Sequence, residues 1–238
     1  MSGTGVTAVV LASRGGPRLA RALDSVAWAE ARAVLDPARR LAAEPLPAGV
    51  SHDVAEPAPA TAWLLLLHEG EVVPVALADA IRTVLARPSP APAFRIPVEL
   101  RAFGTRLRLR GAPIRLACAA GARLRLGSTL EIALEGLGER PARLAVPLVA
   151  RGAGSLAEAV DDLDGDGAAL AALLRGRHRR THVRHLLLAP LGAAGRVLCA
   201  GGRSRIRWGR WALAVLAGYR TMVAYAKLWE LHHVEGGE

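Results

Sequence analysis

Residues 63–74 read Trp63-Leu-Leu-Leu-Leu-His68-Glu69-Gly70-Glu71-Val-Val-Pro74. An apolar run with no polar alternation is typical of a strand that is buried on both faces, as in a parallel sheet. The run ends abruptly in charged residues and a glycine, which indicate a turn at the end of the strand. The stretch therefore predicts a buried strand that leads directly into a polar turn.

The residues before this stretch predict a strand–helix–strand unit. Val6–Ala12 is a second apolar run, and Ser13–Pro17 has the composition of a turn. Apolar residues then recur at helical spacing over Leu19–Trp28, and Ala31–Leu35 is a further buried strand that closes at Asp36. Such a unit implies two parallel strands joined by a right-handed crossover.

The rest of the chain predicts more short strands and then helices. We expect helices at 74–86, from 155 onward, at 186–198 with an interruption near Pro190, and at 208–231, and short strands at 94–97, 106–110, 115–116, 123–126 and 130–134. The proline-rich residues 37–60 leave room for one short helix near 38–43. This order predicts an α/β domain over residues 1–150, followed by a helical segment over residues 151–238.

Charge is distributed unevenly along the 238 residues. Residues 1–90 carry 8 Lys/Arg and 9 Asp/Glu, whereas residues 175–238 carry 12 and 3. A basic end of this kind implies an anionic partner: a membrane surface, an anionic lipid or nucleic acid. Nucleic acid is the least supported of these partners, because no helix-turn-helix, zinc or RNA-binding signature accompanies the charge.

The expected compartment is the cytoplasm. Cys118 and Cys199 match no metal or redox spacing and suit a reducing environment. No basic-then-apolar leader precedes Val6, and no uncharged apolar run reaches the roughly 18–20 residues that a spanning helix needs.

Four stretches together resemble family 2 glycosyltransferases of the lipopolysaccharide-core glucosyltransferase type. They are the opening strand with Arg21–Trp28, the quoted 63–74, Phe94–Pro97 with Phe103-Gly104, and Tyr219–Leu231. The resemblance implies a glycosyltransferase A-type, Rossmann-like mixed sheet flanked by helices. It also implies hexose transfer from a nucleotide sugar to a lipopolysaccharide-core or lipid-linked glycan acceptor.

The resemblance also suggests site residues. In the family the buried strand runs into Asp-x-Asp-Glu, which holds a divalent metal and the sugar nucleotide. Here the same register reads His68-Glu69-Gly70-Glu71. Glu69 and Glu71 are the implied ligands for Mg²⁺ or Mn²⁺, and Ser13, Asp36 and His68 would contact the nucleotide. Glu131 would be the catalytic base.

Two alternatives remain open for the site. Arginines of the basic segment would clamp the diphosphate if no metal is bound. Alternatively, because both aspartates of the motif are replaced, the chain is a catalytically inactive paralogue that binds or scaffolds partners in envelope polysaccharide assembly.

The C-terminal half offers two further patterns. Asp162-x-Asp164-x-Asp166-Gly167 fits the first half of a calcium loop but is more often a solvated turn, because Leu173 stands where the bidentate Glu belongs. In the final helix an apolar stripe runs beside the arginines, either to lie in a lipid interface at the inner membrane or to pack on the α/β domain. The stripe comprises Trp208, Trp211, Val215, Tyr219, Met222, Ala226 and Trp229.

Overall fold

A computed structural model describes residues 4–39, 41, 46–53, 60–87, 91–108, 112–126, 132–135, 141–152, 155–176, 183–199 and 208–234. The helices are α1 (Pro17–Ser25), α2 (Val75–Leu85), α3 (Leu156–Gly176), α4 (Val183–Cys199) and α5 (Trp208–Val234). The strands are β1 (Val6–Leu11), β2 (Ala31–Leu35), β3 (Val50–Asp53), β4 (Trp63–His68), β5 (Glu71–Val72), β6 (Ala93–Arg95), β7 (Val98–Ala102), β8 (Thr105–Arg108), β9 (Ile114–Cys118), β10 (Arg123–Leu126), β11 (Ile132–Glu135), β12 (Ala142–Arg143) and β13 (Leu148–Arg151).

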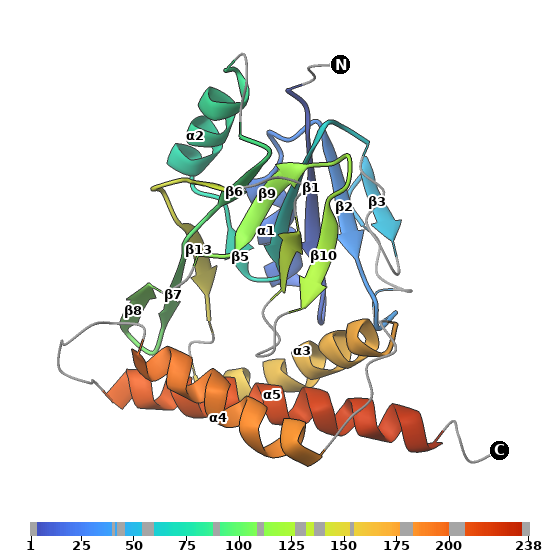
Figure 1. Ribbon diagram of the computed structural model, residues 1–238, viewed down its shortest axis with the longest axis vertical. Helices are drawn as coiled ribbons and strands as arrows, with labels where there is room; N and C mark the ends of the chain where they lie inside the picture. Colours follow the sequence, from blue (N-terminus) through green and yellow to red (C-terminus); the bar gives the residue numbers. More distant parts are fainter. Residues whose placement is uncertain are drawn as a thin grey trace.

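A seven-stranded mixed sheet forms the centre, in the order β12-β6-β9-β4-β1-β2-β3. Strands β4, β1, β2 and β3 run parallel, and β9 runs antiparallel between β4 and β6. A second sheet has the order β5-β13-β7-β8, and β10 and β11 form a hairpin. The expected mixed α/β sheet flanked by helices, with a helical C-terminal segment, is confirmed (Figure 1).

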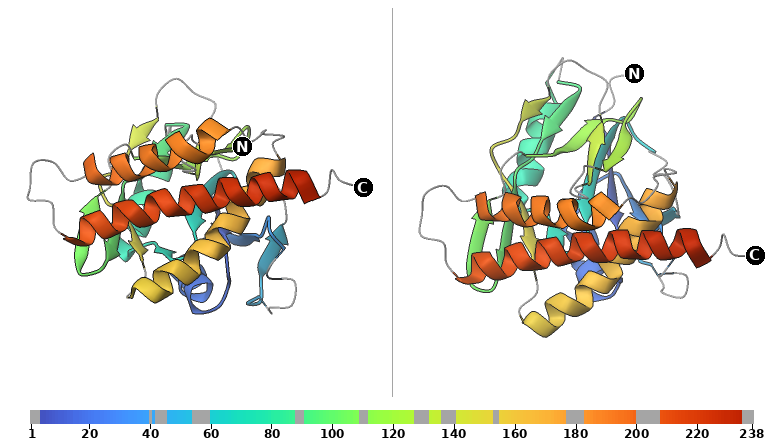
Figure 2. Two further views of the ribbon diagram at one scale, coloured as in Figure 1. Left: turned by 90° about the horizontal axis from the view of Figure 1, so that it is seen from below. Right: turned by 60° about the horizontal axis from the view of Figure 1, so that its bottom comes forward.

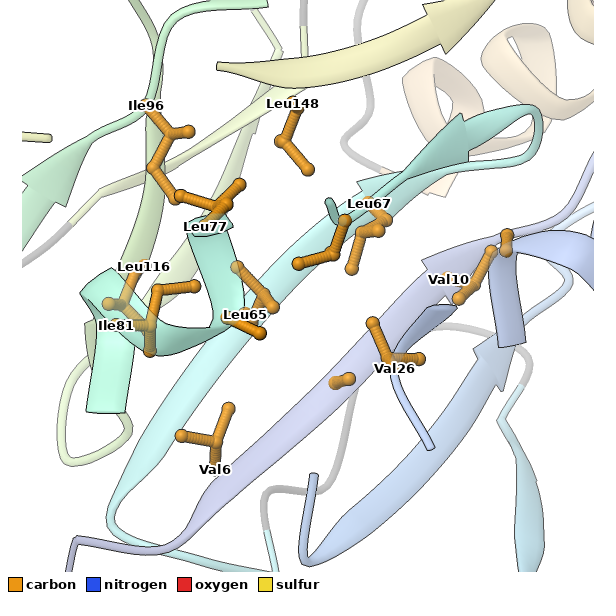
Figure 3. Packing of buried hydrophobic residues seen from close by; sticks show 14 of the residues in the cluster. Val6, Val10, Val26, Leu65, Leu67, Leu77, Ile81, Ile96, Leu116 and Leu148 are labelled. Carbon is orange, nitrogen blue, oxygen red and sulfur yellow. The ribbon is translucent and has the colours of Figure 1, made fainter. Parts of the chain in front are cut away.

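Each face of the central sheet has its own apolar core. Val6, Val10, Leu65 and Leu67 point to the face covered by α1 and α2, where they pack with residues such as Ile81 (Figure 3). Alternate residues of the same strands point to the other face, as the two-residue repeat of a strand requires.

The opposite face connects the sheet with the C-terminal helices. Val9 and Leu66 of the sheet share one buried cluster with Leu170 of α3 and with Tyr225 and Leu228 of α5. The helices lie across the edge where β1 and β4 end (Figure 1). The C-terminal segment is therefore packed on the sheet, while its expected division into a separate domain stays a prediction.

Several local expectations need correction. Val50–Asp53 forms β3 and Val98–Ala102 forms β7, and neither strand was expected. The Asp162–Gly167 stretch is helical rather than a loop, so the calcium-loop and solvated-turn interpretations are both wrong. Pro190 lies inside α4 without ending the helix. Helix α3 begins with a capping residue, since Ser155 Oγ accepts a hydrogen bond of 3.1 Å from the Glu158 N–H.

Candidate functional site

A cavity of about 350 Å³ lies where β1 and β4 end. Its walls come from the loop after β1, the turn after β4, strands β7, β9 and β13, and the inner faces of α3, α4 and α5. A cavity of this size falls within the usual range for small-molecule sites, and the carboxyl edge of parallel strands is where open α/β sheets bind ligands. The charged side chains that line it are Arg14, Arg18, Glu69, Glu71, Arg115, Arg151, Asp162, Asp166, Arg196 and Arg220.

Glu69 holds the loop that follows β1. Its Oε2 accepts hydrogen bonds from the backbone N–H groups of Ser13 (2.7 Å), Arg14 (2.9 Å) and Gly15 (3.1 Å). The N–H of Glu69 in turn donates to the Leu11 carbonyl at 2.8 Å, so the ends of the parallel strands β1 and β4 are joined. Gly15 has a φ of 80°, which favours glycine at this position. The carboxylate of Glu69 therefore has a structural role, and it would have to break these hydrogen bonds to bind a metal ion.

Glu71 forms a buried ion pair with Arg115 of β9. Arg115 Nη2 lies 2.9 Å from Glu71 Oε1, and the two side chains are 4% and 6% exposed. Glu71 Oε2 also accepts a hydrogen bond of 2.8 Å from the His68 N–H. Both oxygens of Glu71 are therefore engaged, one with a cation and one with the backbone turn.

Arg115 retains hydrogen-bonding capacity that the described residues do not use. Its Nε and Nη1 are buried and have no hydrogen-bond partner among those residues. Buried donors of this kind are rare, because an unsatisfied polar group is costly, and they call for a ligand or bound water. Arg115 also lines the cavity, so its positive charge would attract an anion there.

Arg220 of α5 adds a second cation to the cavity. Its Nε lies 3.0 Å from Asp166 Oδ2 of α3, close enough for electrostatic attraction, although the direction does not make a hydrogen bond. The pair is about a third exposed, so its charge is partly screened by solvent.

His68 is uncharged at neutral pH. Burial lowers the pKa of its imidazole well below the usual value, and the charges of Arg115 and Arg220 lower it further. The same two arginines that repel a proton would attract an anionic ligand. His68 is therefore suited to donate or accept a hydrogen bond as a neutral ring.

Ion pairs connect α3 to the loop after β1 and to α1. Arg18 pairs with Asp162 and with Glu158, and Arg14 Nη1 lies 3.4 Å from Asp162 Oδ1. Burial lowers the pKa of Arg18, but its hydrogen bonds and the attraction of both carboxylates outweigh this and raise it. Burial raises the pKa of Asp162, an effect that the neighbouring arginines only partly offset. These pairs close one side of the cavity.

The structure brings together four of the six residues named from the sequence. Ser13, His68, Glu69 and Glu71 all line the cavity. Asp36 does not line it: the side chain is 1% exposed and accepts a hydrogen bond of 2.7 Å from the Leu41 N–H. Glu131 lies outside the described residues, so its predicted role as the base stays a prediction, as does the nucleotide contact of Asp36.

The residues present do not fit a divalent cation. Glu71 already faces Arg115, Glu69 is held by three amides, and two arginines surround His68. Within the described part of the chain, no group of three or more His, Cys, Asp or Glu side chains is placed to hold a metal. Gly70, at the second aspartate position of the family motif, has a φ of 86° and serves the turn into β5.

Arg115 and Arg220 were not singled out from the sequence. Arg115 stands in the otherwise apolar strand Ile114-Arg-Leu-Ala-Cys118, and a lone charge in a buried strand is a signal for a buried ion pair. Arg220 is one of many arginines in the basic segment, and only the packing of α5 shows that it faces inward.

Comparison with models of protein families found no match, and comparison with curated proteins also found none. Among solved structures, the chain is similar to the crystal structure of S. aureus TarS 1-349, a glycosyltransferase. The alignment has 10% sequence identity and a TM-score of 0.39, and it covers 98% of this chain and 92% of that chain. This similarity is too low to indicate a function, so the functional proposal below is based on the cavity.

Proposed function

We propose that the chain is a glycosyltransferase-like protein that binds a nucleotide sugar in the cavity. In this proposal it transfers a hexose to a lipopolysaccharide-core or lipid-linked glycan acceptor. The observation that carries the proposal is Arg115, a buried guanidinium with two unused donors that lines a cavity at the carboxyl edge of parallel strands. A nucleotide diphosphate offers the oxygens that such donors need.

In this reading, arginines take the place of the metal. In the transfer step a hydroxyl of the acceptor attacks C1 of the hexose, and the bond from C1 to the diphosphate breaks. The electron pair leaves with the nucleoside diphosphate, and the hydroxyl proton passes to a base, for which Glu131 is the candidate by resemblance. Charge that develops on the leaving diphosphate would be stabilised by Arg115 and Arg220, since fixed donors act strongly where charge appears in the transition state.

Calorimetric titration with UDP, GDP, CDP and dTDP tests the binding step, first in EDTA and then with Mg²⁺ or Mn²⁺. We expect binding in EDTA that is lost in Arg115→Met and weakened in Arg220→Gln. The matched control is Arg82→Gln on α2, an exposed arginine outside the cavity whose loss leaves binding unchanged.

The Glu71→Gln variant distinguishes binding through a metal ion from binding through Arg115. If Glu71 were a metal ligand, its loss would abolish metal-dependent binding. If Arg115 binds the diphosphate, removal of its internal counterion leaves binding intact or strengthens it. Failure to bind any of the four nucleotides would overturn the proposal.

An inactive paralogue with a scaffolding role is the second candidate. It is favoured by the structural use of Glu69 and Glu71, the two carboxylates that the family motif would give to the metal. A folded protein that binds no nucleotide, and that pulls down partners of envelope polysaccharide assembly, would support this candidate.

A further inference from the structure

The outer surface of α4 and α5 exposes many large apolar side chains. On α5, Trp208 is 90% exposed and Val215 is 65% exposed. The whole set, which we call the α4–α5 face, comprises Leu187, Leu188 and Leu191 of α4 and Trp208, Trp211, Val215, Tyr219, Met222 and Trp229 of α5. Contiguous exposed apolar surface is unusual on a monomeric soluble protein and marks an interaction site.

The exposed stripe of α5 is distinct from the side that packs on the protein. Leu213, Ala214, Ala224, Tyr225 and Leu228 are buried, and they alternate at helical spacing with the exposed set. The alternative that the aromatic stripe packs on the α/β domain therefore fails for these side chains. Tyr225, which the stripe omits, makes that contact instead.

Helices α4 and α5 lie side by side. They pack together along their length, and both views in Figure 2 show them as neighbours. The approach is close at Gly218, where an added Cβ would come within 3.1 Å of the Pro190 carbonyl oxygen. The exposed leucines of α4 and the exposed aromatic residues of α5 therefore belong to one packed pair of helices.

The sequence that leads into α4 and into α5 carries charge of one sign. Residues 175–210 contain no Asp or Glu, and α5 has no acidic residue before Glu230. The arginines in that stretch are Arg175, Arg177, Arg179, Arg180, Arg184, Arg196, Arg203, Arg205, Arg207 and Arg210. Arg210 is buried, and its Nε donates a hydrogen bond of 3.2 Å to the Val197 carbonyl, so it does not add to the exposed charge. The acidic residues of this half belong mostly to α3, where Asp166 pairs with Arg220 and Asp164 with Lys227.

We propose that the α4–α5 face docks on an anionic lipid bilayer, with the helices lying in the plane of the interface. Tryptophan and tyrosine favour the interface, apolar side chains enter the acyl boundary, and arginines attract anionic headgroups. A symmetric contact with a second copy fits less well, because it would bring two strongly basic segments together. No helix among the described residues is long and apolar enough to cross the bilayer.

Vesicle flotation of the full chain tests the proposal, with phosphatidylcholine vesicles compared with vesicles that contain one-third phosphatidylglycerol. We expect binding only to the anionic vesicles, with release when NaCl rises from about 0.1 to about 1 M. The double variant Trp211→Gln/Val215→Gln should lower the partition coefficient by about tenfold or more. Val75→Gln is the matched control, since Val75 is 78% exposed but lies on α2.

Several outcomes would overturn the proposal. One is the absence of binding to anionic vesicles, and another is a double variant that binds as well as the wild type. A third is a wild-type dimer in light scattering that the double variant breaks while vesicle binding is absent, which would assign the face to a second copy. Thermal unfolding followed by circular dichroism should show that the variants are folded, because both substituted side chains are exposed.

Discussion

The buried pair of Glu71 and Arg115 allows a quantitative test of the site. Three variants are needed: Arg115→Met, Glu71→Gln and the double variant. Arg115→Met leaves a carboxylate that is almost fully buried with one hydrogen bond, from the His68 N–H. Glu71→Gln leaves a buried guanidinium without its counterion, in which two donors already have no partner among the described residues.

The expected magnitudes follow from burial. Removal of one partner of a buried ion pair costs about 3–5 kcal/mol, because the other charge stays out of water. The double variant replaces both charges with neutral side chains of similar length, and such replacements are often close to neutral, so we expect a loss of about 1–2 kcal/mol. The coupling energy between the two positions should therefore be at least about 4 kcal/mol.

Urea unfolding of the four proteins at one pH measures this coupling. The free energies of unfolding give the interaction energy as the departure from additivity. If the double variant lost as much stability as the two single variants together, the view that these side chains compensate each other's charge would be refuted. The double variant also provides a binding control: it should be well folded and yet fail to bind a nucleotide, since it lacks the guanidinium.

Three further predictions concern other positions in the protein. Glu69→Ala should lower the free energy of unfolding by about 2–4 kcal/mol because three amides lose their acceptor, whereas Glu69→Gln should lose only about 1 kcal/mol; equal losses in urea unfolding would contradict this. Because the folded pKa of His68 is depressed, wild-type stability should fall as pH drops below 6.5, and His68→Gln should reduce that slope by up to about 1.4 kcal/mol per pH unit. Tyr225→Ala should cost about 3–5 kcal/mol and Trp211→Ala less than about 1 kcal/mol, and a reversed order in thermal unfolding would contradict the orientation of α5.

The central sheet could be predicted from the sequence because its strands are nearly pure apolar runs. Val6–Leu11, Ala31–Leu35 and Trp63–His68 are buried from both sides, and such strands carry a strong local signal. Strand β3 was missed because Val50-Ser-His-Asp53 lies at the sheet edge and has a polar sequence. An edge strand forms by pairing with its neighbour, so its own residues say little.

The location of the site was predictable, but its chemistry was not. The carboxyl ends of β1 and β4 must meet in a parallel pair, which brings Ser13 and Glu69 together. The partner of Glu71 is Arg115, 44 residues away and on an antiparallel strand, and no local pattern links the two. Likewise, the spacing of Asp162 and Asp166 suggests ligands for a metal cation. In the structure their carboxylates pair with arginines instead.

Helix α5 joins the two proposals physically. Arg220 and Thr221 line the cavity, whereas Tyr219 and Met222, one position away on either side, belong to the exposed α4–α5 face. The helix therefore separates the cavity from the surface that we assign to the bilayer by only its own thickness, about 10 Å with side chains. If both assignments hold, a glycan on a lipid carrier would reach the cavity without leaving the interface. The separating experiment is the Trp211→Gln/Val215→Gln variant: it should keep its affinity for a free nucleotide while losing vesicle binding, because the exposed side of α5 can be changed without touching the side that holds Arg220.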